Sequence, residues 1–269
     1  VALNIEAFGF GIGKGAAIAP PDQAHSHSIY SWRDYGNRVG IWRLFDLLDQ
    51  LQIPAEAQLN TEVYEVAPDI PARLRARGDE ILGHGATNSE EQGHLPEEHE
   101  RALIERVTAT IVRHEGARPV GWMSPWLSNS ALTMDLLQEA GYRYVMDWTM
   151  DDQPIWIRTR KGRILALPYP IEVNDTRGIV WYHYTAAEFA GMIVDQFDEM
   201  LEQSVGQPLV CPISLHPFVI GRPYRIRQLR RAFEHILQHR DRIWLTRPRD
   251  ICAHIESLPP GIVPGAGDS

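Results

Sequence analysis

Segments of strand length alternate with segments of helix length along this chain, and the alternation restricts the folds available to it. Short apolar runs at residues 1–6, 55–59 and 80–83 are each followed by a longer segment, such as 39–51, whose apolar residues recur at helical spacing. Further strands are predicted near 120–121, 142–146, 164–167, 209–214 and 242–245, with helices over 72–77, 98–114, 130–140, 186–203 and 224–239. Strands joined by crossover helices pair in parallel, so the pattern predicts an α/β fold, either a closed barrel or an open sheet.

Length and composition are those of one globular domain. The chain has 269 residues, of which 44% are hydrophobic and 23% are charged. An α/β barrel commonly uses about 250 residues as a single domain. No break in composition divides the sequence, so we predict one domain over residues 1–257, followed by a loose Gly/Pro-rich tail over 258–269.

Charge and cysteine content exclude several classes of partner. With 26 Lys+Arg against 35 Asp+Glu, the net charge of −9 argues against nucleic acid. No run approaches the about 20 apolar residues that cross a bilayer, so we predict no membrane partner. Cys211 and Cys252 are too few for a disulfide framework, and the first residues lack a signal-peptide pattern. We predict a cytoplasmic protein, although the chain begins at Val1 and a signal upstream of it stays open.

A glycine-rich run and the loose histidines match no established motif. Residues 9–15 resemble a phosphate-binding loop but fit neither the Walker nor the dinucleotide template, so we interpret them as an active-site loop. The histidines between 94 and 99 lack a third ligand at a diagnostic spacing. The arginines between 222 and 231 lie on several faces of a predicted helix, which indicates a solvated or dimer-facing surface.

Polar side chains follow successive predicted strands, at the end of the sheet where α/β enzymes place their chemistry. They are Asn4 and Glu6, His84 and Asn88, Ser124-Pro125-Trp126, Asp147-Trp148, Glu172 with Asn174-Asp175, and His216-Pro217. Singly, Glu6 fits a solvated strand end, His84 a helix cap or core histidine, and His216 a turn residue. Together, a carboxylate, two histidines and aromatic walls at one barrel mouth fit hydrolysis of a polar C–N bond.

Six motifs, taken in order, resemble one known family. They are Asn4-Ile5-Glu6, residues 35–43, Gly83-His84-Gly85-Ala86-Thr87-Asn88, Pro125-Trp126, residues 168–175, and Leu215-His216-Pro217 with Gly221-Arg222-Pro223. The set is similar to the polysaccharide deacetylase (NodB-homology) superfamily, and especially to its branch of metal-independent allantoinases and cytoplasmic peptidoglycan-deacetylase-like proteins. The resemblance covers nearly the whole chain and implies a distorted (β/α) TIM-like barrel. With the long apolar face of residues 39–51, it also suggests a homo-oligomer.

The family pattern bears on metal binding. Zinc-dependent members present two acids and H-x-x-x-H, but here Asn88 stands in place of the second histidine and the first motif keeps one carboxylate. If the acids are read as adjacent, Glu6 is the base and Ala7 the missing ligand; if they are read as D-x-D, Asn4 is the missing base and Glu6 the ligand. Zinc normally takes three protein ligands and a water. We therefore predict metal-independent chemistry and no cofactor; a metal, if bound, would face Glu6, His84 and Asn88.

The resemblance implies roles for the strand-end residues. Glu6 would activate water, His216 would protonate the leaving nitrogen, and His84 with nearby backbone N–H groups would stabilise the oxyanion. The expected substrate-binding residues are Trp126 and Trp148 as walls, with Arg38, Glu172, Asn174 and Asp175 as hydrogen-bonding groups.

These roles predict a hydrolase of a non-peptide C–N bond in a small polar substrate that carries an amide, a ureide or an N-acetyl group. The alternatives are a metal-dependent polysaccharide or peptidoglycan N-deacetylase of carbohydrate metabolism, and a non-catalytic sugar- or ureide-binding protein of the same fold.

Overall fold

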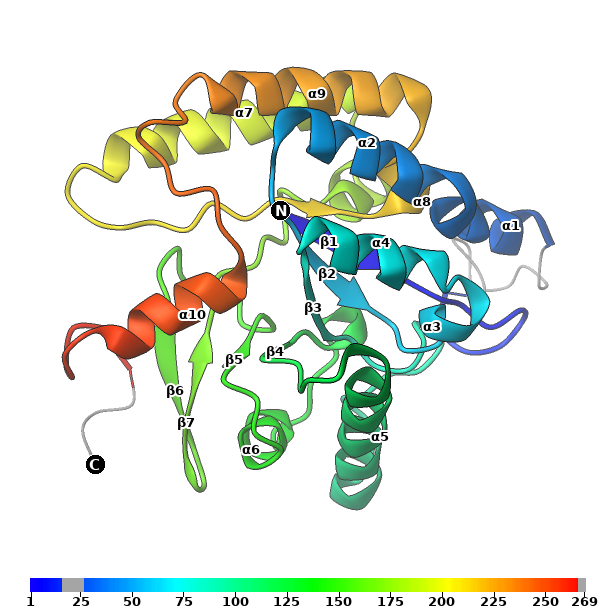
Figure 1. Cartoon of the computed structure of the whole chain (residues 1–269), viewed down its shortest axis with the longest axis vertical. Helices are drawn as coiled ribbons and strands as arrows, with labels where there is room; N and C mark the ends of the chain where they lie inside the picture. Colours follow the sequence, from blue (N-terminus) through cyan, green and yellow to red (C-terminus); the bar gives the residue numbers. More distant parts are fainter. Residues whose placement is uncertain (16–26, 266–269) are drawn as a thin grey trace.

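One curled sheet of eight strands forms the centre of the protein, in a computed structural model that describes residues 1–15 and 27–265 (Figure 1). The strand order is β6-β7-β5-β4-β3-β2-β1-β8, and every neighbouring pair is parallel except β6 and β7. The strands are β1 (Ala2–Ile5), β2 (Glu56–Leu59), β3 (Glu80–Gly83), β4 (Gly121–Trp122), β5 (Tyr144–Val145), β6 (Ile155–Thr159), β7 (Gly162–Ala166) and β8 (Ser214–Leu215). The predicted α/β fold with a distorted barrel-like sheet is confirmed, and the sheet curls into a half-barrel.

Helices cover the outer face of the sheet. They are α1 (His27–Tyr35), α2 (Ile41–Leu51), α3 (Val63–Val66), α4 (Asp69–Arg77), α5 (Glu97–Glu115), α6 (Thr133–Glu139), α7 (Ala186–Gln203), α8 (Pro217–Ile220), α9 (Pro223–Leu237) and α10 (Pro248–Ser257), with π-helical turns at Gly36–Gly40 and Thr176–Trp181 and a 3₁₀ turn at Pro125–Leu127. The start of α7 is fixed by a capping box, in which Thr185 and Glu188 satisfy each other's backbone N–H groups. Among the described residues, no helix has both the length and the apolarity needed to cross a membrane.

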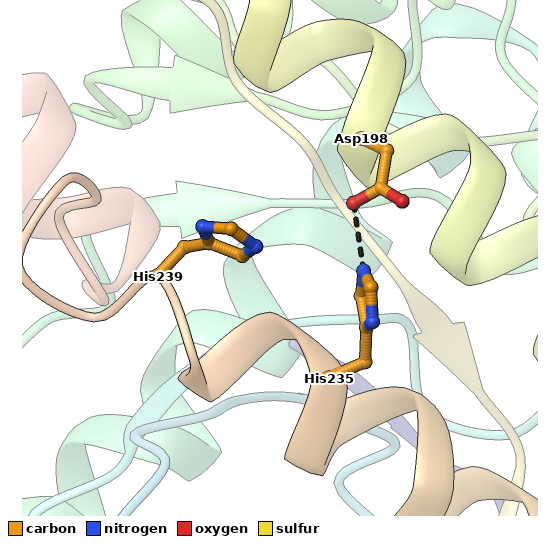
Figure 2. A group of neighbouring side chains, drawn as sticks. All are labelled: Asp198, His235 and His239. Atoms are coloured by element: carbon orange, nitrogen blue, oxygen red, sulfur yellow. Dashed lines mark hydrogen bonds and ion pairs between the residues drawn. The ribbon is translucent and has the colours of Figure 1, made fainter.

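Helices α7 and α9 lie side by side over one end of the sheet (Figure 1). Asp198 of α7 and His235 of α9 join them, with 2.7 Å between the carboxylate oxygen and Nε2 (Figure 2). His239 follows one turn later and also faces this pair. The apolar faces predicted for residues 186–203 and 224–239 therefore pack against each other as well as against the sheet.

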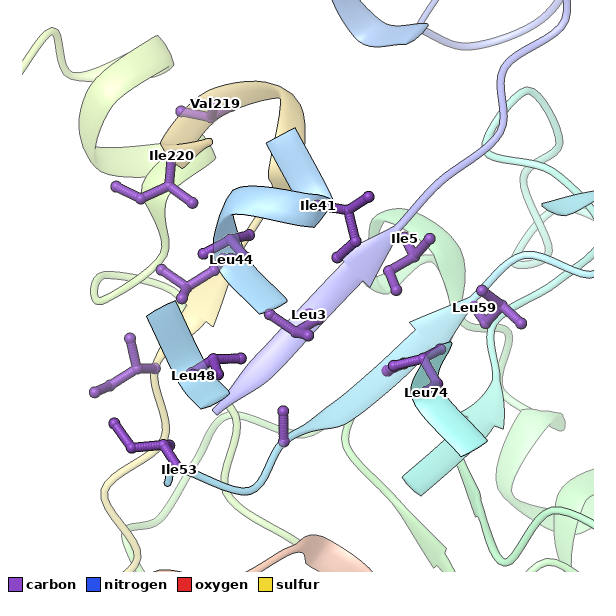
Figure 3. Packing of buried hydrophobic residues seen from close by; sticks show 14 of the residues in the cluster. Leu3, Ile5, Ile41, Leu44, Leu48, Ile53, Leu59, Leu74, Val219 and Ile220 are labelled. Carbon is purple, nitrogen blue, oxygen red and sulfur yellow. The ribbon is translucent and has the colours of Figure 1, made fainter. Parts of the chain in front are cut away.

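The apolar core is organised around β1. Leu3 and Ile5 are fully buried under α2, whose Ile41, Leu44 and Leu48 point down onto the strand (Figure 3). Side chains alternate along a strand, so Ala2 and Asn4 point the other way, into the interior of the half-barrel. Burial on both faces explains why the first strand is almost continuously apolar and why its one polar residue matters to the site.

The interior of the half-barrel is polar. Glu56 and Gln58 of β2 and Glu80 of β3 are buried there, and the Tyr144 hydroxyl donates a hydrogen bond to Glu80 at 2.9 Å. Burial raises the pKa of Glu56 to about 8 and that of Glu80 to about 7, because a charged carboxylate is poorly solvated inside the sheet. Glu56 and Glu80 begin their strands, and they do not line the cavity described below, which lies at the opposite ends of the strands.

Several elements differ from the sequence prediction. Residues 155–159 form an antiparallel edge strand, so the sheet is not wholly parallel as the βα pattern implied. Of the strand predicted over 209–214, only Ser214 pairs in a ladder, together with Leu215. The strand predicted over 242–245 is a loop in which Trp244 is exposed, because it has no partner strand beside it. Helices α1 and α10 were not predicted.

The described part of the predicted C-terminal tail contacts the edge strand β6. Of the predicted tail, residues 266–269 lie outside the described residues, while the Pro264 carbonyl accepts a hydrogen bond from the Trp156 backbone. The boundary at residue 257 stays a prediction.

Cys211 and Cys252 are both free thiols, as expected without a disulfide framework.

Stability should fall with rising pH through the titration of Glu56. Its folded pKa lies above the ordinary value of 4.5, so the stabilisation is complete below that value and is lost as pH rises toward 8. The loss is about 1.4 kcal/mol per pH unit over that window. Thermal unfolding between pH 5 and 8 should therefore be less pH-dependent for Glu56→Gln than for wild type. Equal slopes for the two proteins would contradict the assignment.

Candidate active site

A cavity of about 290 Å³ opens at the carboxyl ends of β1, β3 and β8. Its wall contains Glu6, His84 and His216, which follow these three strands directly, together with the aromatic rings of Trp126 and Phe218. Parallel strands end at one edge of a sheet, and this geometry brings together residues that are more than 200 positions apart. Of the six strand ends predicted to meet, those that carry Glu6, His84 and His216 meet at this cavity, whereas Asp147-Trp148 and Glu172 do not line it.

His216 lies between two carboxylates. Its Nδ1 is 2.7 Å from Asp175, which also accepts a hydrogen bond from the His216 backbone N–H, and its Nε2 is 3.7 Å from Glu6. Burial works against the imidazolium, but the charges of Asp175 and Glu6 outweigh it and raise the pKa of His216 above its usual value. Burial also raises the pKa of Glu6, while His216 and Arg33 act in the opposite sense. The arrangement provides a carboxylate base and an imidazolium acid in contact.

Thr176 and Asn174 fix the orientation of the imidazole. The Thr176 hydroxyl donates to Asn174 Oδ1 at 2.6 Å and lies 3.2 Å from His216 Nε2. The hydroxyl is also 3.1 Å from Nδ1, and because its hydrogen is already used, Thr176 can only accept a hydrogen bond from the ring. His216 itself has extended backbone angles, φ −109° and ψ 120°, as predicted for a residue that precedes proline.

The Asn88 side chain is held by protein groups on both sides. Its Nδ2 donates to Glu6, and its Oδ1 accepts a hydrogen bond from Asn60 Nδ2 at 3.0 Å. Asn60 follows β2 and also accepts from the Ala7 backbone N–H at 2.9 Å. The amide thus occupies one oxygen of Glu6, and its own oxygen is engaged by Asn60.

His84 is a neutral acceptor in this structure, which changes its predicted role. Its Nδ1 is 2.7 Å from the Met123 carbonyl, and a carbonyl only accepts, so the proton is on Nδ1. Burial lowers the pKa of His84 to about 4. The buried Nε2 then presents a lone pair without a partner among the described residues, and it cannot donate a hydrogen bond to an oxyanion.

Gly85 allows the loop after His84 to turn. It has φ 64°, and an added Cβ would lie 2.7 Å from Cγ of Pro125. Across the cavity, Trp126 adopts φ 63° and its indole N–H donates to the Asn88 carbonyl at 2.8 Å. A left-handed conformation costs a tryptophan about 1–3 kcal/mol, which the surrounding contacts must offset.

The donors at this cavity do not fit the zinc site of the metal-dependent pattern. Among the described residues, Glu6, His84 and His216 do not bring three ligand atoms together at metal-binding spacing, and the carboxamide of Asn88 is engaged by Asn60 and Glu6. Structural and catalytic zinc sites use at least three protein ligands. The one group of His and acidic side chains spaced for a metal among the described residues is Asp198, His235 and His239, outside the cavity (Figure 2).

Three predicted substrate-binding residues lie away from the cavity wall. Arg38 has a side chain that is 75% exposed and sits 3.8 Å from Asp34. Trp148 and Glu172 are exposed as well, and neither lines the cavity. Their motifs are adjacent to the site in sequence, but the π-helical turn and the loops that carry them direct these side chains outward. Asn174 lines the cavity, and Asp175 lies buried behind His216.

The structure adds residues that the sequence prediction missed. Asn60 follows a strand as Glu6 and His84 do, so the same rule could have found it. Arg33 of α1 and Tyr169 also line the cavity, and Lys14 and Gly15 place the glycine-rich loop at its rim. Arg33 gave no signal in the sequence because α1 itself was not predicted.

Comparison with known proteins agrees with this architecture. Residues 22–145 match the family model "Polysaccharide deacetylase". The crystal structure of Puue allantoinase is 25% identical, with a TM-score of 0.85 over 96% of this chain and 89% of that one. A probable polysaccharide deacetylase from Pseudomonas aeruginosa PAO1 is 26% identical, with a TM-score of 0.83 over 94% and 88% of the two chains.

Two curated relatives are named as deacetylases. A putative polysaccharide deacetylase of Schizosaccharomyces pombe is 26% identical over an alignment of 250 residues, which covers 86% of this chain and 77% of that protein. The chain is thus similar to the polysaccharide deacetylase superfamily over most of its length. The peptidoglycan deacetylase of Helicobacter pylori is 22% identical over 245 residues, 79% of this chain and 82% of that protein. The superfamily is one of C–N hydrolases, and its barrel-like fold is the one predicted from the sequence.

The cavity should bind zinc weakly. Because Asp198, His235 and His239 could take up zinc independently, the measurement is made in a His239→Ala background. Elemental analysis after dialysis against micromolar zinc should then find clearly less than one equivalent, and a chelator should leave the melting temperature unchanged. Stoichiometric, chelator-resistant zinc that disappears in the additional variant His84→Ala would contradict the prediction.

Proposed function

We propose that this protein is a metal-independent hydrolase of a non-peptide C–N bond, an amide or a ureide, in a small polar substrate. The observation that carries the proposal is the buried array Glu6–His216–Asp175, in a cavity where the Asn88 amide takes a position that a metal ligand would need. A carboxylate that can act as base and an imidazolium that can act as acid are thereby held 3.7 Å apart in one buried site.

The reaction follows from these positions. Ionised Glu6 takes a proton from water, and the water oxygen forms a bond to the acyl carbon of the substrate. The tetrahedral intermediate then breaks its C–N bond as His216 gives the Nε2 proton to the leaving nitrogen. The products are an acid or carbamate and an amine, and transfer of the proton from Glu6 to His216 restores the starting state. Each proton transfer is over a short distance, since the two side chains are 3.7 Å apart.

His84 is given a binding role in this proposal. A bare Nε2 lone pair at the cavity wall accepts a hydrogen bond from an N–H group, and amides and ureides both carry one. This pairing would place the nitrogen side of the scissile bond toward His84.

The dimensions of the cavity favour a small substrate over a polymer. About 290 Å³ is at the low end of the volumes that bind small molecules. The similarity to Puue allantoinase supports the same choice, whereas the name of the Helicobacter pylori relative supports an N-deacetylase. A soluble, homo-oligomeric, cytoplasmic enzyme remains our expectation from the sequence.

Removing the acid or the base should abolish most turnover. We expect His216→Asn and Glu6→Gln each to lower kcat about 10²–10⁴-fold while leaving the fold intact. Wild type and variants are assayed on ureides, cyclic amides and N-acetyl sugars, with and without zinc. Activity on N-acetyl sugars that appears only with zinc would reject the metal-independent reaction. Turnover of the variants within a few-fold of wild type on an active substrate would reject the roles of both residues.

The pH profile should report on Asp175. The active form has Glu6 ionised and His216 protonated, so kcat/KM rises as Glu6 loses its proton and falls as His216 loses its own. Asp175 supports the raised pKa of His216, and Asp175→Asn should therefore move the alkaline limb to lower pH. A uniform loss of activity with an unmoved alkaline limb would assign Asp175 to structure alone.

A further inference from the structure

Arg33 is a buried cation whose guanidinium has no hydrogen-bond acceptor in the described part of the chain. It is only 8% exposed, and its guanidinium lies over the ring of Phe8 at 4.0 Å and near that of Phe218 at 5.3 Å. Its Nε is buried without a partner, and within residues 1–15 and 27–265 no side chain or carbonyl accepts a hydrogen bond from its guanidinium. Arginine is rarely buried unless it is paired, because desolvation of the charge is costly.

Arg33 faces the cavity that contains Glu6 and His216. The geometry therefore presents planar N–H donors to a bound molecule, between aromatic walls that exclude water. A guanidinium fork matches a carboxylate, which accepts two parallel hydrogen bonds.

The charges of the cavity wall agree with an anionic ligand. Among the residues that the structure describes, Glu6 is the only carboxylate that lines it, against the cations Lys14, Arg33 and Arg177. Lys14 is ion-paired with Glu91, whereas the Arg177 guanidinium has no ion pair among the described residues and lies over Trp181. A cationic wall in a protein of net charge −9 is a local feature that attracts anions to this opening.

We propose that Arg33 binds a carboxylate of the substrate, so that the substrate class is a ureido acid or an acylamino acid. In this arrangement the carboxylate pairs with Arg33, an N–H pairs with His84 Nε2, and the carbonyl carbon lies toward Glu6. The choice of bond to be cleaved rests on the proposed function, but binding of the carboxylate does not. Neutral sugars offer hydroxyl groups, which cannot form the charge-assisted bidentate pair that a carboxylate forms with a guanidinium.

Binding is tested with a matched pair of ligands, N-carbamoylglycine and its uncharged amide, N-carbamoylglycinamide. Titration by NMR reports affinity and any cleavage in the same sample. We expect the acid to bind at least about 10-fold more tightly than the amide, as a charge-assisted pair implies. Equal affinity of wild type for the two ligands would overturn the proposal without the need for any variant.

Variants separate Arg33 from other cations. Arg33→Met should weaken binding of the acid by about 10–100-fold and leave binding of the amide nearly unchanged, and Arg33→Lys should recover part of the preference. Arg38→Met is the matched control, because Arg38 lies five residues further along the same segment and outside the cavity. Loss of the preference in Arg38→Met, or its retention in folded Arg33→Met, would overturn the assignment.

The experiments distinguish failure of the proposed carboxylate site at Arg33 from failure of the proposed hydrolase activity. If the acid is preferred and the preference depends on Arg33, but no ligand is cleaved, the carboxylate site stands and the hydrolase is rejected. If acid and neutral compounds are cleaved equally by wild type and Arg33→Met, the hydrolase stands and the carboxylate site is rejected.

Discussion

The fold and the site both depend on the burial of β1 on its two faces. Leu3 and Ile5 pack under α2, while Asn4 points inward and hydrogen-bonds to Ser214 of the neighbouring strand at 3.0 Å. The strand is thereby fixed in register between β2 and β8. Because Glu6 is the next residue, its carboxylate enters the cavity from a rigid support, as general-base catalysis requires.

A second constraint is the amide network around Glu6. Asn60 and Asn88 connect the ends of β1, β2 and β3 through side-chain hydrogen bonds that involve no ionised group other than Glu6 itself. Where a zinc ion would organise its ligands, these amides hold the carboxylate in place by direct contact. The same network leaves His84 free to act through one nitrogen only, since its other nitrogen is anchored to Met123.

Charge in the cavity is distributed in two units. Asp175 and His216 form a buried pair behind the wall, and Glu6 lies between that pair and Arg33. The protonation states of Glu6 and His216 are coupled through their proximity, so they titrate as a pair. Arg33 adds positive charge that favours ionised Glu6. His216 and Arg33 thus offset part of the effect of burial, which raises the pKa of Glu6.

The sequence by itself determined the α/β class, the order of most helices and strands, and the strand ends that carry Glu6, His84 and His216. These features are local, because periodicity and the direction of a parallel strand set them. Asn60 obeys the same rule and was accessible to it. The tertiary structure decided the rest: the tautomer of His84, the partners of Asn88, the exclusion of Arg38 and Trp148, and the presence of Arg33. The physical reason is that hydrogen-bond partners and the direction of a helical side chain depend on how elements pack in space, which no local pattern specifies.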